Sequence, residues 1–292
     1  MKPKLLLSAG LPSSGSTSLY YTVWDNNYAH GGVLKENNYL LSIQSPERFK
    51  QNRKKKDFGK KIDTPWKTNS EFFNPSLSEE HYTNVSFDAL CSSSLEKYIN
   101  YNLKLWEDVK DNFQSVADFS NSNRHLTEEF MMSIRDELLK YFDIKVVMIF
   151  RDPIRMVWST CNRRSKLGEG SPESILEKNF DHPNLKYVEL YEKYVRVWGK
   201  DKVKLIINED FYKGDTKSLS KFLEFNILPT YKKITHLSSL KEKLYSQWCN
   251  YNYETWKYAY ENMKWVYENF ENNFGYIPSD WGKWYIAAEK PK

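Results

Sequence analysis

Cysteine is scarce in this 292-residue chain, which carries only Cys91, Cys161 and Cys249. Their number is odd, they lie far apart, and none has the spacing of a zinc site. This pattern argues against a disulfide framework and against structural zinc, and it fits a reducing compartment. We therefore expect a protein that is stabilised by a hydrophobic core, which a chain of this length can build without cross-links.

Long apolar runs are also missing. The longest, such as residues 146–150, fall far short of the roughly 20 residues that a membrane span requires. Residues 1–7 (MKPKLLL) look like the start of a secretory signal, but the apolar run stops at once and leads into a glycine-rich turn. We expect neither a transmembrane helix nor a signal peptide, and hence a cytoplasmic protein.

Neither sign of charge dominates: 43 Lys and Arg face 38 Asp and Glu, a net charge of +5. This mild excess suits an anionic ligand but is far below that of a dedicated nucleic-acid binder. A basic run from Arg53 to Lys61 lies in a polar stretch at about 42–86, which we predict to be an insertion on the acceptor side. The remainder is compatible with one domain over 1–292, ending in an aromatic helical extension at about 231–292.

What the chain does contain is an alternation of short apolar runs with stripes of helical spacing. Strands are expected at 4–9, 115–118, 145–150 and 203–207, with a short second strand at 33–34. Helices are expected after residue 16 and at about 95–113, 130–138, 153–165 and 187–198. Such alternation predicts an α/β fold with a central, mainly parallel sheet flanked by helices.

The turn after the first strand, Gly10 to Thr17 (GLPSSGST), has the design of a phosphate loop. Backbone N–H groups and the positive end of the following helix together bind phosphate. The turn is similar to the Walker pattern, but Ser16 stands where that pattern has lysine, which argues against an ordinary ATPase or kinase. For the loop alone, a serine-rich turn that caps a helix remains the alternative.

The same loop closely resembles the 5′-phosphosulfate loop of sulfotransferases, which use 3′-phosphoadenosine 5′-phosphosulfate (PAPS). Those enzymes carry a second motif, a strand ending in Arg-Asp-Pro with a serine eight residues after the arginine. Here Arg151-Asp152-Pro153 follows the strand at 145–150, and Ser159 stands at that distance. An arginine at a strand end offers phosphate a planar fork of donors, to which a serine adds a hydroxyl.

The resemblance implies a P-loop-like sulfotransferase fold and a set of contacts to the nucleotide. Arg151 and Ser159 would hold the 3′-phosphate. The loop contacts to the 5′-phosphosulfate would come from Leu11, Pro12, Ser13, Ser14, Gly15, Ser16 and Thr17. Residues 118–122 (DFSNS) and 208–211 (NEDF) are also similar to segments of the family.

The candidate catalytic residues come from residues 35–39 (KENNY), which look like the Lys-Glu-x-His-Phe segment of heparan-type sulfotransferases. This resemblance implies Glu36 as the catalytic base, with an exposed Lys-Glu pair at a strand end as the alternative. The family usually carries a lysine or arginine where Ser13 stands here. Lys35, or an arginine such as Arg163, would have to supply that charge, and His30 is a candidate auxiliary base.

The activity implied is transfer of a sulfuryl group from PAPS to a hydroxyl or amine of a glycan or small molecule, leaving adenosine 3′,5′-bisphosphate (PAP). No metal is needed, and the five histidines are scattered. Three alternatives stay open: a P-loop kinase, a non-catalytic nucleotide-binding protein on the same fold, and a nucleic-acid binder. We expect neither nucleic acid nor a membrane as a partner, and the sequence leaves the acceptor and the oligomeric state open.

Overall fold

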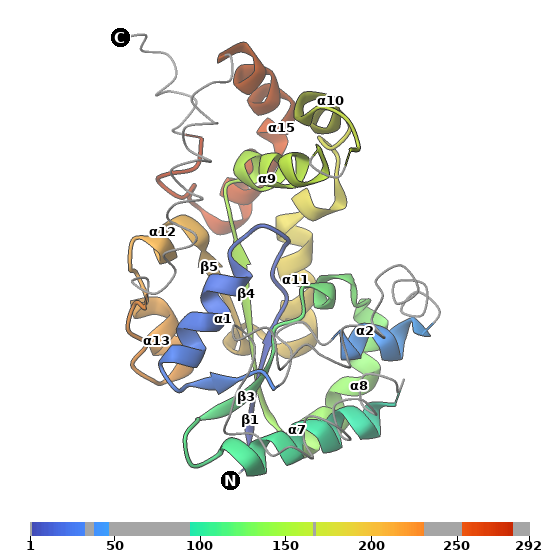
Figure 1. Ribbon diagram of the computed structural model, residues 1–292, viewed down its shortest axis with the longest axis vertical. Coiled ribbons are helices and arrows are strands. Elements are labelled where there is room, and N and C mark those ends of the chain that lie inside the picture. The colour runs from blue at the N-terminus through green and yellow to red at the C-terminus, as the bar shows by residue number, and fades with distance from the viewer. Residues whose placement is uncertain (1, 33–37, 47–93, 166–167, 231–252, 283–292) are drawn as a thin grey trace.

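The computed structural model describes residues 2–32, 38–46, 94–165, 168–230 and 253–282. Five strands in this part of the chain form one sheet in the order β2-β3-β1-β4-β5, and every pairing is parallel (Figure 1). The strands are β1 (Lys4–Ser8), β2 (Ala29–His30), β3 (Ser115–Asp118), β4 (Asp143–Phe150) and β5 (Val203–Ile207). The predicted α/β fold with a parallel sheet is confirmed.

The edge strand β2 lies upstream of the short strand expected at 33–34, which falls outside the described residues. Ala29 pairs with Ser115 and His30 with Val116, while the carbonyl of Tyr28 accepts hydrogen bonds from the N–H groups of Gln114 and Ser115. A strand of two residues has no alternation that periodicity could detect. For this reason the sequence could not locate it.

The two faces of the sheet are both covered, as the apolar character of its strands requires. Leu5 and Leu7 of β1 pack into one core cluster and Leu6 into the other, because successive side chains of a strand point to opposite faces. One face carries α2 (Tyr39–Gln44), α7 (Leu95–Val109), α8 (Glu128–Tyr141) and α11 (Tyr187–Trp198). The other carries α1 (Ser16–Asp25), α12 (Asn208–Tyr212) and α13 (Lys217–Leu223).

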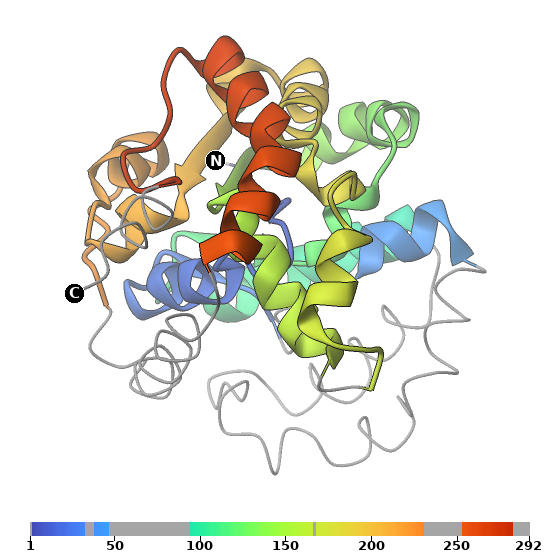
Figure 2. The ribbon, with the colours of Figure 1, turned by 90° about the horizontal axis from the view of Figure 1, so that it is seen from above.

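A further group of helices lies beyond the carboxyl ends of the strands, at the top of Figure 1. It comprises α9 (Pro153–Ser165), α10 (Pro172–Glu177) and α15 (Tyr253–Phe274). Helix α9 packs against both of the others, and Figure 2 shows α15 passing over the molecule beside it. Met263, Tyr267 and Phe270 of α15 are buried, so the predicted aromatic stripe serves core packing. Short 3₁₀ turns are η2 (Asn121–His125), η3 (Pro183–Leu185) and η4 (Lys200–Lys202).

The predicted insertion and extension are only partly described. Residues 42–44 belong to helix α2, with Ser42 buried and its hydroxyl donating to the Tyr39 carbonyl at 2.6 Å. The rest of the insertion from residue 47, and residues 231–252 and 283–292 of the extension, lie outside the described residues. The single-domain organisation therefore stays a prediction. None of the described helices is both long and apolar enough to cross a membrane.

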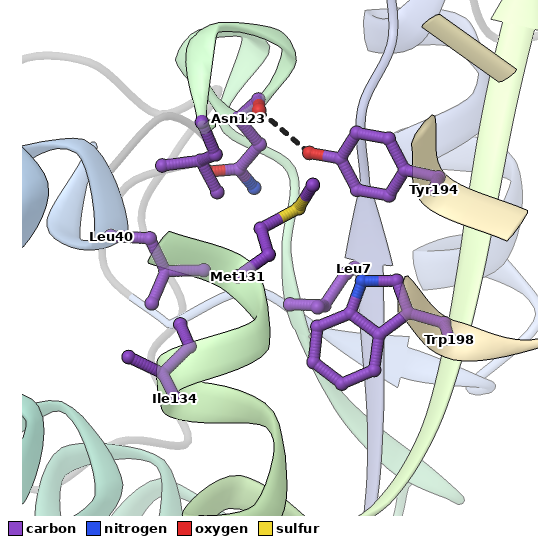
Figure 3. A pocket seen from close by; sticks show the side chains of 8 residues that line it. Leu7, Leu40, Asn123, Met131, Ile134, Tyr194 and Trp198 are labelled. Atoms are coloured by element: carbon purple, nitrogen blue, oxygen red, sulfur yellow. Dashed lines mark hydrogen bonds between the residues drawn. The ribbon is translucent and has the colours of Figure 1, made fainter. Parts of the chain in front are cut away.

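A small apolar pocket lies between β1, α2, α8 and α11 (Figure 3). Above it the Tyr194 hydroxyl donates to the Asn123 carbonyl at 2.6 Å, which ties η2 to α11. The pocket has room for about one water molecule, so it cannot hold a substrate. Its lining consists of Leu7, Leu40, Asn123, Leu126, Met131, Ile134, Tyr194 and Trp198.

Candidate functional site

The loop after β1, the end of β4 and the start of α12 meet at the carboxyl edge of the sheet. Ser8 pairs with Val147, so β4 continues for three residues beyond the level at which β1 ends. This extension brings Arg151 alongside the loop at residues 9–15, and β5 ends at the level of Phe150. Open α/β sheets bind their ligands at this edge.

The loop takes a conformation that requires glycine at residue 15. Gly15 has a φ of 94° and precedes α1 as its N-cap, where it contributes no capping side chain. A Cβ atom there would lie 2.1 Å from Nδ2 of Asn208. Ser13 also takes a positive φ, of 60°. The sharp turn thus aims the positive N-terminus of α1 toward the space above the loop.

Ser14 of the loop is fully buried, at 0% exposure. Its Oγ has no hydrogen-bond partner among the described residues, although its carbonyl accepts from Nδ2 of Asn208 at 2.7 Å. Ser18 of α1 and Tyr212 of α12 share a hydrogen bond between their hydroxyls at 2.5 Å. Helix α12 therefore holds the loop and the start of α1 in place through side-chain hydrogen bonds. The sequence pointed to residues 208–211 by resemblance but gave no sign of this contact.

Arg151 lies against the loop and presents part of its guanidinium without a partner. Nη1 donates to the Ser13 carbonyl at 3.0 Å, whereas the buried Nε has no partner in the described part of the chain. The Tyr187 hydroxyl donates to the Arg151 carbonyl at 2.8 Å and so fixes the backbone. Burial lowers the pKa of Arg151, Glu209 opposes this change, and Arg155 adds to it. Arginine stays protonated nonetheless, because its ordinary pKa lies far above neutrality.

Behind Arg151, the buried carboxylates of Asp152 and Glu209 connect the end of β4, the start of α12 and residues 281–282. Oε1 of Glu209 accepts from the Asp152 N–H at 3.1 Å, and Oε2 accepts from Trp281 Nε1 at 2.8 Å. Oδ2 of Asp152 accepts from the Gly282 N–H at 2.8 Å. Burial raises the pKa of Glu209, and the neighbouring Asp152 raises it further. These hydrogen bonds hold the backbone on both sides of Arg151, and composition gave no signal for them.

Asp152 also begins helix α9. Its Oδ1 accepts from the Arg155 N–H at 3.0 Å, and Pro153 takes the first helical position. An aspartate cap followed by proline is a strong helix start, which explains why the sequence located this helix correctly. The Arg-Asp-Pro motif thus positions the arginine while its aspartate starts the next helix.

The other residues predicted to contact the nucleotide differ in how exposed their side chains are. Ser159 lies in the second turn of α9 and is partly exposed, without a hydrogen bond to Arg151. The Leu11 side chain is buried in the hydrophobic core at 1% exposure, so only its backbone can face a ligand. Pro12 is partly buried, and Thr17 is exposed in the first turn of α1.

The two candidate catalytic residues, Lys35 and Glu36, lie outside the described residues, and nothing is described of the Arg163 side chain. Asn38, two residues after Glu36, donates its N–H to Ser120 Oγ at 2.8 Å, and Ser120 lies just beyond the end of β3. The roles of Lys35 and Glu36 therefore stay predictions.

His30, the candidate auxiliary base, is buried at 0% exposure. Its ring lies 4.5 Å from that of Trp24 and 4.9 Å from that of Phe113, between centroids. Nδ1 accepts the Gly32 N–H at 3.0 Å. Because aromatic rings enclose it, we assign His30 a structural role.

A further buried carboxylate, that of Asp118, ends β3 on the other side of β1. Its carboxylate accepts from the Ser120 N–H at 3.0 Å and from the Tyr98 hydroxyl at 3.3 Å. Burial raises the pKa of Asp118, and these hydrogen bonds partly offset the change. The described residues contain no group of His, Cys, Asp and Glu side chains arranged to hold a metal ion.

No known family model matches the chain, and no curated protein matches it in sequence. Solved structures do: a sulfotransferase from Alicyclobacillus acidocaldarius superposes with a TM-score of 0.56 at 14% identity, covering 96% of this chain and 99% of that one. A sulfotransferase from Mycobacterium avium gives a TM-score of 0.43 at 12% identity, covering 94% and 77%. The first likeness identifies the class of structure: the chain has the sulfotransferase fold.

Proposed function

We propose that this protein is a PAPS-dependent sulfotransferase, which transfers a sulfuryl group to a hydroxyl or amine of an acceptor, either a glycan or a small molecule. The observation that carries the proposal is the contact between Arg151 and the Ser13 carbonyl, at the carboxyl edge of a sulfotransferase fold. This contact joins the two sequence motifs that the resemblance to sulfotransferases rests on.

The residues at this edge fit a phosphorylated ligand. The Ser14 hydroxyl and Nε of Arg151 are buried donors that have no partner among the described residues. A buried donor without a partner is destabilising in a native protein and calls for an explanation, which an anionic ligand provides. The glycine N-cap of α1 adds a helix end without a capping side chain.

When bound, PAPS would supply the sulfuryl group: a bond forms from the acceptor oxygen or nitrogen to sulfur while the bond from sulfur to the 5′-phosphate oxygen breaks, releasing PAP. Ser14, Ser16 and Thr17, with the N-terminus of α1, would hold the 5′-phosphosulfate and stabilise charge on the departing oxygen. Arg151 and Ser159 would bind the 3′-phosphate.

The acceptor side of the reaction rests on residues 35–36. Glu36 would accept the proton that the acceptor hydroxyl or amine loses during attack. Lys35 would supply the positive charge that Ser13 lacks. The scheme requires no metal and no covalent enzyme intermediate.

A non-catalytic PAP-binding protein on the same fold is the second candidate, and Ser13 is the observation that favours it. An uncharged side chain stands at this loop position, and its carbonyl is already engaged by Arg151. Tight binding of PAP without transfer to any acceptor would support this alternative.

Incubation with labelled PAPS and a panel of glycans, phenols, alcohols and amines tests the proposal. We expect labelled product, formed equally well in the presence of EDTA. Magnesium-dependent ATP hydrolysis would instead support the kinase alternative. Calorimetry gives an independent measurement, because PAP should bind far more tightly than AMP. Equal affinities for the two nucleotides would remove the basis of the proposal.

A further inference from the structure

Helix α9 presents a polar face that includes a residue outside both nucleotide motifs. Arg155, Ser159 and Asn162 are spaced at i, i+4 and i+7, which places them on one side of the helix, and all three are partly exposed. Val157 and Cys161, on the side that faces away from these three, are buried in the core. Arg155 therefore shares its helix face with the serine expected to bind the 3′-phosphate.

The position of Arg155 is unfavourable for a residue with a purely structural role. It lies in the first turn of α9, where the positive end of the helix favours acidic side chains and disfavours arginine. Throughout the described chain its guanidinium has neither a hydrogen bond nor an ion pair. By contrast, Arg164 near the end of the same helix pairs with Glu169 at 2.7 Å.

A second positive charge lies close to Arg155. Arg151 precedes it by four residues, and Arg155 contributes to the lowered pKa of Arg151, after burial, while Glu209 and Asp152 oppose that change. Together the two guanidinium groups offer a phosphate more donors and more positive charge than Arg151 alone, whose charge Glu209 and Asp152 partly offset. A phosphate monoester carries about −1.5 to −2 at neutral pH, so a single arginine would leave it incompletely neutralised.

We propose that Arg155 is a further binding residue for the 3′-phosphate of the nucleotide, acting with Arg151 and Ser159 along one face of α9. This inference rests on the proposed function, since it presumes a nucleotide with a 3′-phosphate. It adds a residue that selects 3′-phosphorylated nucleotides over those that carry a 5′-phosphate alone.

Calorimetric titration of the full-length protein with PAP and with AMP tests the inference. The variants are R155A, R155K and, as a matched control, R164A, which removes the same charge from the opposite face of α9. We expect R155A to weaken PAP binding by about ten- to a hundredfold and to leave AMP binding nearly unchanged. R155K should fall between, because lysine keeps the charge but loses the planar fork. R164A should bind PAP like the wild type.

Thermal unfolding without ligand separates binding from structure. Removal of an unpaired arginine from a helix N-terminus should leave the melting temperature of R155A unchanged or higher, whereas a structural role would lower it. If the wild type prefers PAP but R155A keeps the full preference, the role of Arg155 is wrong and the proposed function stands. Equal losses in R155A and R164A would also overturn it. If the wild type does not distinguish PAP from AMP, the proposed function itself fails.

Discussion

The ends of the two strands that flank β1 make an instructive comparison. Asp118 follows β3 and Arg151 follows β4, and both carry a charge into a largely buried setting. The carboxylate of Asp118 accepts hydrogen bonds from Ser120 and Tyr98, whereas Nε of Arg151 has no partner in the described chain. A buried polar group whose hydrogen bonds are satisfied makes the fold more rigid, and one with an unused donor is suited to bind a ligand.

The comparison extends to the surroundings of each residue. The side of Arg151 contains the loop and α12, which together would hold the nucleotide. The side of Asp118 contains Ser120, whose Oγ accepts a hydrogen bond from the Asn38 N–H, two residues after Glu36 in the sequence. We therefore expect nucleotide binding to depend on the β4 side and acceptor chemistry on the β3 side. The following predictions test this division, beginning with the largest effect.

Glu36→Gln should lower kcat by about 10² to 10⁴-fold, the usual contribution of a general base, and leave PAP affinity nearly unchanged. Steady-state kinetics at saturating acceptor, with calorimetry of PAP, measures both quantities. Ser13→Lys serves as a comparison, since a new cation in the loop could rescue Lys35→Ala but not Glu36→Gln. A near-normal kcat in Glu36→Gln would place the base elsewhere.

Arg151→Ala should weaken PAP binding by about ten- to a hundredfold, because a charge-assisted hydrogen bond contributes about 1.5 to 3 kcal/mol. AMP affinity should change much less. Calorimetric titration of both nucleotides measures the ratio, with Asp118→Asn as the control from the other side of β1. A parallel loss of PAP and AMP affinity would show that Arg151 only supports the loop through its bond to Ser13.

Asp118→Asn should reduce the free energy of unfolding by about 1 to 3 kcal/mol, because its new amide group would face the Ser120 and Tyr98 donors. The ratio of PAP to AMP affinity should stay at the wild-type value. Urea denaturation followed by circular dichroism gives the stability, and calorimetry gives the ratio. A changed ratio with unchanged stability would reverse the roles that we assign to Asp118 and Arg151.

Glu209→Gln should alter how stability depends on pH, with a smaller effect than the changes above. Because the folded-state pKa of Glu209 is raised, its contribution to stability is fully present below the unfolded pKa and is lost as pH rises through the folded pKa. Glutamine stays neutral, so the melting temperature of the variant should rise relative to the wild type by a few degrees as pH increases across that range. Thermal melts of both proteins at matched pH values measure the difference; a constant difference would contradict the raised pKa.

The sequence predicted those parts of the molecule that depend on local patterns. Strand β5 and helix α9 have the expected bounds, since a β-branched run and an Asp-Pro helix start are both local signals. Strand β2 was missed because its two residues are held by pairing with β3 rather than by their own periodicity.

For the candidate site, the sequence predicted the loop and Arg151 through motifs, but not the contacts that hold them. The hydrogen bond from Asn208 to the Ser14 carbonyl joins residues that lie 194 positions apart, and no local pattern indicates such a partner. Arg155 was overlooked for a different reason: it belongs to neither motif, and only the helix face that it shares with Ser159 sets it apart. Tertiary hydrogen bonds and shared faces are properties of the folded chain.

The bonds from Trp281 to Glu209 and from Gly282 to Asp152 have a consequence for how the protein is made. The second of them joins residues that lie 130 positions apart. During synthesis the sheet can assemble once β5 has emerged, but the backbone around Arg151 lacks these partners until Trp281 and Gly282 have also emerged. Because pairing so distant in sequence forms slowly, nucleotide-binding capacity should be acquired late, and a chain ending before Trp281 should fold its sheet yet bind PAP poorly.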